Sequence, residues 1–152
     1  MGFSGRILVA RISEPYQGGD VAVLWEDERA HGWRWVQLDG DVPGALEEVV
    51  AASGAPAIAA YVLDSDVADV EALTPSGRRF HTYLHPRTAA QFGAPALSQS
   101  PDEVLAAALG WSAEAGLVAE PAAVRAALEA HSVQAEDTLA GLIEALGISE
   151  EV

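Results

Sequence analysis

The segment from Val67 to His85 constrains the fold most, because it contains the tight-turn signal Thr74–Pro75–Ser76–Gly77 between two strand-like runs. Proline presets the turn and glycine accepts a positive φ, so the chain folds back on itself here. A two-residue loop would place Glu71 opposite Phe80 and mix polar with apolar residues on both faces. A three-residue loop with Gly77 in the left-handed conformation gives one coherent apolar face. This second register pairs Ala68 with Leu84, Val70 with Thr82 and Ala72 with Phe80.

The opposite face of this predicted hairpin carries the candidate binding residues Asp69, Glu71, His81, Tyr83 and His85. The register places Glu71 directly across from His81. Imidazoles and carboxylates are groups that ligate zinc or transfer protons near neutral pH. However, residues four apart in a strand are separated by about 13 Å, so His81 and His85 would need a bulge to share one ion. A solvated or partner-binding polar face is therefore favoured, and no metal is assigned.

A second candidate site is the acidic run Asp64–Ser65–Asp66, followed by Asp69, after the apolar segment 57–63. Carboxylates two residues apart can bind Mg²⁺ or Ca²⁺ through their oxygens. The run departs from a calcium-binding EF-hand loop, which requires glycine where this chain has Asp69. Acids that cap a turn and face water are the simpler interpretation.

The remaining pattern predicts an α+β fold with a mostly antiparallel sheet of about six strands. Strand-like runs cover 6–12, 21–26 and 33–38, a three-stranded meander, and then 57–63 and the two arms of the hairpin. Pro43 opens a mid-chain helix that Gly54 ends. The segment 57–63 is apolar on both alternating faces, which is typical of a central strand covered on both sides.

Beyond Pro86 the pattern predicts a C-terminal group of three helices. The first has an N-cap serine at Ser100, a first-turn proline and Glu103 at the capping-box position. A second begins near Pro121 and a third ends before Gly147. The prediction is one α+β domain over 1–152, sheet-rich over 1–86 and helical over 87–148.

Four tryptophans are predicted to pack in the core. Trp25 lies in the second strand, and Trp33 and Trp35 lie on one face of the third. Trp111 is expected to pack its helix against the sheet. The alternative is an aromatic platform that stacks a ligand ring or anchors a protein partner.

Composition excludes several chemistries. The chain has no cysteine, and all eight of its basic residues are arginines. Disulfides, thiolate catalysis, P-loop phosphate binding, pyridoxal Schiff bases and Ser-x-x-Lys acyl transfer are therefore excluded, and no cofactor is predicted. The N-terminus shows neither a signal region nor a lipidation motif, and no stretch is long enough to cross a bilayer. We expect a cytoplasmic protein without membrane contact.

The net charge of −15 bears most directly on partners, since 23 acidic side chains face 8 basic ones. Such a surface repels nucleic acid and attracts a basic protein. The leading hypothesis is a non-enzymatic binding domain, such as a regulator, an inhibitor or an immunity-type protein. The alternative is a small metal-dependent or hydrolytic enzyme that uses Asp64 and Asp66, or Glu71 and His81. An exposed edge strand or the tryptophan face could also support a homodimer.

Overall fold

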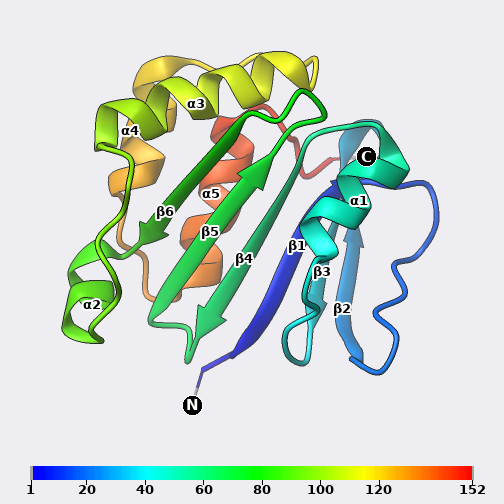
Figure 1. Cartoon of the computed structure of the whole chain (residues 1–152), viewed down its shortest axis with the longest axis horizontal. Coiled ribbons are helices and arrows are strands. Elements are labelled where there is room, and N and C mark those ends of the chain that lie inside the picture. Colours follow the sequence, from blue (N-terminus) through cyan, green and yellow to red (C-terminus); the bar gives the residue numbers. More distant parts are fainter. Residues whose placement is uncertain (1, 152) are drawn as a thin grey trace.

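A computed structural model describes residues 2–151 as a six-stranded antiparallel sheet with helices on both faces (Figure 1). The strands are β1 (Gly5–Arg11), β2 (Val23–Glu28), β3 (Trp33–Leu38), β4 (Ala57–Leu63), β5 (Val67–Leu73) and β6 (Arg79–Leu84). The helices are α1 (Ala45–Ser53), α2 (Pro86–Gln91), α3 (Pro101–Glu114), α4 (Pro121–Glu129) and α5 (Ala135–Ala145), with a 3-10 turn at Ala30–Gly32. The predicted α+β class is confirmed, with α1 in mid-chain and α3, α4 and α5 at the C-terminal end.

The strand order is β2-β3-β1-β4-β5-β6, so β1 pairs with β3 and not with β2. The predicted three-stranded meander would have placed β2 beside β1, and the strand order corrects this pairing, while the predicted hairpin of β2 and β3 is observed. The connection after β1 instead passes over β3, where the carbonyl of Ile12 accepts a hydrogen bond from Arg34 Nε at 3.2 Å. This order puts β1, whose central residues Ile7 to Ala10 are apolar and buried, near the middle of the sheet and leaves β2, whose side chains are largely exposed, at one edge.

The hairpin of β5 and β6 adopts the predicted register. Ala68 pairs with Leu84, Val70 with Thr82, Glu71 with His81 and Ala72 with Phe80. Gly77 has a φ of 93°, and its N–H donates to the carbonyl of Thr74 at 3.0 Å. The three-residue loop at Pro75 therefore forms because glycine accepts the left-handed conformation that closes it.

Two apolar cores lie on opposite faces of the sheet. The larger one joins Val70, Phe80 and their neighbours to α3, α4 and α5. The smaller one joins Leu8 and Val36 to α1 and to the connection after β1. Because α1 is a single short helix, it covers only part of its face, and the β5–β6 end of that face is left to polar side chains (Figure 1).

The tryptophans divide between these environments. Trp33, Trp35 and Trp111 are buried as predicted, and Trp111 Nε1 donates to the carbonyl of Ala57 at 3.1 Å. The prediction that Trp25 lies in the core is wrong, because its exposed fraction is 59 %. Trp25 belongs to the edge strand β2, which the C-terminal helices do not reach (Figure 1).

The predicted start of α3 is also observed. Ser100 Oγ accepts from the N–H of Glu103 at 3.1 Å, and Glu103 Oε1 accepts from the N–H of Ser100 at 2.9 Å. This reciprocal capping satisfies backbone donors that the first helical turn leaves free. Within residues 2–151, none of the helices has the length and apolarity required to span a membrane.

Candidate functional site

The structure brings four of the predicted residues together on the open end of the α1 face. Asp69 and Glu71 come from β5, and His81 and Tyr83 come from β6. His81 Nε2 lies 2.5 Å from Asp69 Oδ1, a diagonal contact between the two strands. The Tyr83 ring meets the His81 ring edge-on, with 5.4 Å between their centroids. We call this set, Asp69, Glu71, His81 and Tyr83, the acid–histidine face.

The outer edge of β6 is covered by the segment that connects α2 to α3. The N–H of His81 donates to Gln99 Oε1 at 2.9 Å, and Gln99 Nε2 donates to the carbonyl of Arg79 at 3.3 Å. Tyr83 donates its hydroxyl to the carbonyl of Pro95 at 2.8 Å. The amide of Gln99 thus takes the place of a neighbouring strand, which blocks this edge against strand addition and holds the His81 backbone in place.

Burial raises the pKa of the Tyr83 phenol, and the charge of Asp69 raises it further. Both effects disfavour the phenolate. The Tyr83 phenol therefore stays protonated at neutral pH and donates to the carbonyl of Pro95.

The prediction that His85 shares this outward face is wrong. β6 ends at Leu84, and His85 takes the left-handed conformation, with a φ of 62°, where the chain turns into α2. Its side chain is 1 % exposed and lies on the opposite side of the sheet. Nδ1 contacts the carbonyl of Asp66 at 2.8 Å, and Nε2 contacts Thr138 Oγ1 at 2.7 Å. His85 therefore joins the β4–β5 turn to α5 instead of joining His81.

The acidic run Asp64–Ser65–Asp66 forms the turn between β4 and β5 and anchors the N-terminal segment. Asp64 Oδ1 accepts from the N–H of Gly2 at 2.9 Å. Ser65 Oγ accepts from the N–H of Phe3 at 2.7 Å and donates to Glu136 Oε2 at 2.9 Å. Sequence reasoning missed the role of Ser65, whose contacts are all distant along the chain. These contacts give Asp64 a structural role, as in the simpler interpretation of the run.

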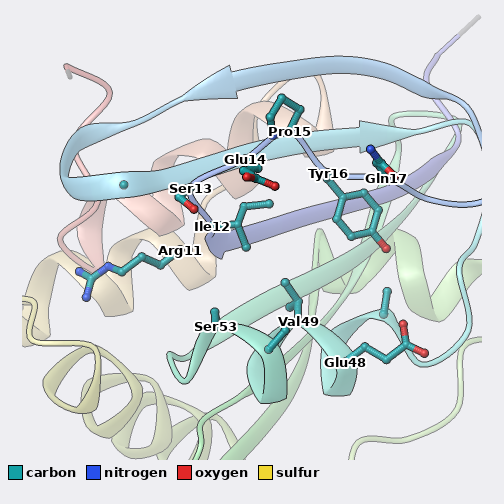
Figure 2. Close-up of a pocket in the computed structure, with 13 residues that line it drawn as sticks. Arg11, Ile12, Ser13, Glu14, Pro15, Tyr16, Gln17, Glu48, Val49 and Ser53 are labelled. Atoms are coloured by element: carbon teal, nitrogen blue, oxygen red, sulfur yellow. The ribbon is translucent and has the colours of Figure 1, made fainter.

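A groove that the sequence did not reveal lies between α1 and the segment that follows β1, with a volume of about 740 Å³. Figure 2 shows Ile12 and Tyr16 on that segment facing Val49 on α1, with Glu48 beyond the Tyr16 hydroxyl and Glu14 on the other side of Ile12 from α1. The groove therefore combines an apolar floor with carboxylates. The only sequence signal for it was the proline- and glycine-containing loop over 13–20, which does not identify a pocket.

The charges of this groove are unbalanced. Within residues 2–151, neither Glu14 nor Glu48 forms an ion pair or a side-chain hydrogen bond. Burial raises the pKa of Tyr16, and the charge of Glu48 raises it further. Arg11 lines the far end, but its guanidinium lies over the Trp33 ring, 4.9 Å from the centroid. The end of the groove away from Arg11 thus offers the Glu48 carboxylate and a protonated phenol, an environment that favours a cation.

The eight arginines are too few to neutralise the 23 acidic side chains. Of the eight arginines, five form ion pairs with carboxylates of the described chain, with nearest N–O distances between 2.8 and 3.5 Å; these are Arg6, Arg29, Arg34, Arg79 and Arg125. Their charge is therefore already matched, and the surplus of acids faces solvent. Comparison with protein-family models, curated proteins and solved structures found no match. The functional argument accordingly rests on geometry and charge.

Proposed function

We propose that this protein is a binding domain for a basic segment of another protein, and that the groove beside α1 receives a cationic side chain of that segment. The observation that carries the proposal is the pair of unpartnered carboxylates, Glu14 and Glu48, at a groove of about 740 Å³. A lysine or arginine side chain fits such a site, because its methylene stem packs on Ile12 and Val49 while its charged end reaches the acids.

The overall charge supports the choice of partner. With a net charge of −15, the protein attracts basic surfaces over distances comparable to the Debye length. A second copy of the chain carries the same charge, so long-range repulsion favours a basic partner over a homodimer. The same repulsion disfavours nucleic acid, as the sequence predicts.

The neighbouring edge strand supplies apolar contact area. Val23, Leu24 and Trp25 of β2 are exposed, and Glu26 of the same strand accepts from the N–H of Tyr16 at 3.1 Å. That hydrogen bond ties the groove-lining segment to β2. Val23 pairs with Leu38 on the α1 face, so it adds apolar area beside the groove, whereas Trp25 pairs with Gln37 and projects from the opposite face of the sheet.

A domain that covers a basic surface of another protein would act as a regulator, an inhibitor or an immunity-type partner, and a cytoplasmic location suits that role. An enzymatic role is less economical, because the lysine- and cysteine-dependent chemistries are excluded by composition. The proposal therefore assigns recognition, and no reaction, to this chain.

Calorimetric titration with hexaarginine at low salt tests the proposal. We expect binding that weakens as salt is added, because the attraction is electrostatic. The double variant Glu14→Gln, Glu48→Gln should lower the affinity about tenfold, equivalent to about 1.4 kcal/mol. The matched control is Glu129→Gln, Glu144→Gln, which removes the same charge at exposed positions on α4 and α5, the helices of the opposite face.

The control variant distinguishes binding in the groove from non-specific attraction by the net negative charge. If both double variants weaken hexaarginine equally, the groove is not the receptor, and only net charge attracts the peptide. If the unmodified protein binds hexaarginine no better than a neutral hexapeptide at low salt, the proposed function is wrong. Circular dichroism confirms that each variant is folded before its affinity is compared.

A further inference from the structure

We propose that Asp69, Glu71 and His81 form a binding site for a divalent transition-metal ion such as Zn²⁺. Each of the three offers one ligand atom, and these atoms all lie within 4.8 Å of one another. The site lies on the acid–histidine face and is independent of the groove proposed to bind a basic partner.

The ligand set arises directly from the hairpin register. Asp69 and Glu71 are two residues apart on β5, so both side chains project from the same face. His81 stands opposite Glu71 on β6 and contacts Asp69 diagonally, which brings its imidazole between the two carboxylates. The three-residue turn at Pro75 therefore decides whether this site exists.

The ligand chemistry selects among cations. One imidazole nitrogen with two carboxylate oxygens suits Zn²⁺, Co²⁺ or Ni²⁺, whereas Mg²⁺ and Ca²⁺ prefer oxygen ligands alone. Three protein ligands leave the remaining position of a tetrahedral ion to water. The acidic run Asp64–Ser65–Asp66 lacks an imidazole, and Asp64 is engaged with the N-terminal segment.

Metal binding requires only small movements of side chains. Ligand atoms around a tetrahedral zinc are about 3.3 Å apart, since each bond is about 2.0 Å long. His81 Nε2 and Asp69 Oδ1 are 2.5 Å apart, so they must separate slightly as the ion replaces the shared proton. Both side chains are partly exposed and can rotate, while Gln99 holds the backbone of His81.

Two neighbouring groups modulate the affinity. The Tyr83 ring packs edge-on against His81 and limits the orientations of the imidazole. Arg79 lies in the same hollow as Glu71 and His81, and its guanidinium pairs with Glu47 at 3.5 Å. This positive charge opposes an incoming cation, so we expect moderate affinity.

The test is titration of the metal-free full-length chain with Zn²⁺ by calorimetry and with Co²⁺ by visible absorption. His81→Asn, Asp69→Asn and Glu71→Gln should each lower the Zn²⁺ affinity about tenfold or more, because each removes a ligand. The matched controls are His131→Asn and Asp39→Asn, which alter exposed residues elsewhere and should leave the affinity within about twofold. A raised melting temperature with Zn²⁺ should appear in the unmodified protein and be lost in His81→Asn.

Nuclear magnetic resonance of the unmodified protein gives a readout that does not depend on variant folding. Zn²⁺ should shift the ring signals of His81 before those of His31, His85 and His131. If another histidine responds first, or if His81→Asn binds Zn²⁺ as tightly as the unmodified protein, the assignment is wrong. Saturation by Mg²⁺ or Ca²⁺ at equal concentrations would also contradict it, because an imidazole-containing site should discriminate against both.

Discussion

The face of the sheet under α3, α4 and α5 differs from the face under α1 in how its polar groups are used. On the first face, His85 and Ser112 are buried and bonded to distant parts of the chain, for example Ser112 Oγ to the carbonyl of Leu146. On the second face, Glu14, Glu48 and the acid–histidine face remain open to solvent. The comparison teaches that the first face carries stability and the second carries the candidates for binding, because an unpartnered charge persists only where water solvates it.

The largest expected effect is the difference in unfolding free energy between substitutions of a buried tryptophan, Trp111, and an exposed one, Trp25. Trp111→Ala should lower the free energy of unfolding by about 3–5 kcal/mol, because it leaves a cavity beneath α3 and removes the bond to Ala57. The matched change Trp25→Ala on β2 should cost less than about 1 kcal/mol, since that ring is already exposed. Urea unfolding measures both. Equal costs would show that β2 is covered in solution and would contradict the comparison.

Substitutions of His81 and His85, which lie on opposite faces of the sheet, should change the free energy of unfolding by an intermediate amount. His85→Asn should cost about 2–3 kcal/mol, because it removes the hydrogen bonds of the ring to the carbonyl of Asp66 and to Thr138 Oγ1, together with its stacking on the His131 ring. Asparagine accepts the left-handed backbone at this position, so the loss reports on the ring. His81→Asn should cost less than about 1 kcal/mol, since its ion pair is exposed. A larger loss for His81 than for His85 in thermal unfolding would reverse the assignment of the two faces.

The smallest effect is a pH dependence at the tip of the β5–β6 hairpin. The Ser76 hydroxyl donates to Glu114 Oε1 at 2.6 Å, and this hydrogen bond is the main cause that lowers the pKa of Glu114. A carboxylate with a lowered pKa stabilises the fold above its ordinary pKa, and that contribution is lost as the pH falls through the lowered value. Ser76→Ala should therefore reduce the urea midpoint slightly at neutral pH and have less effect in acid. A difference that grows in acid would contradict the ionised state of Glu114.

Local chemistry explains why the hairpin and the caps were predictable. Thr74, Pro75 and Gly77 act on the backbone within a few residues, and the alternation from Ala68 to Ala72 fails in any other register. Ser100 and Glu103 likewise cap a helix through neighbours in the chain. In each case the partners are close in sequence, so pattern and propensity suffice.

Other features depend on contacts between distant segments. Trp25 has the spacing of a core residue, but the strand order places β2 at an uncovered edge. Ser65 joins Phe3 to Glu136, residues that no local pattern connects. The groove exists because the segment after β1 passes over β3 and so comes to face α1.

By itself the sequence determined the α+β class, the hairpin register and the excess of negative charge, because these follow from residue types and from neighbours along the chain. Only the tertiary structure decided that His85 turns inward while His81 remains outside, since a single left-handed residue at the end of β6 reverses the side chain. It also decided which carboxylates are neutralised and which face an open groove. Ion pairs form between whichever charged side chains the packing of the elements brings together, and that packing is a property of the whole chain.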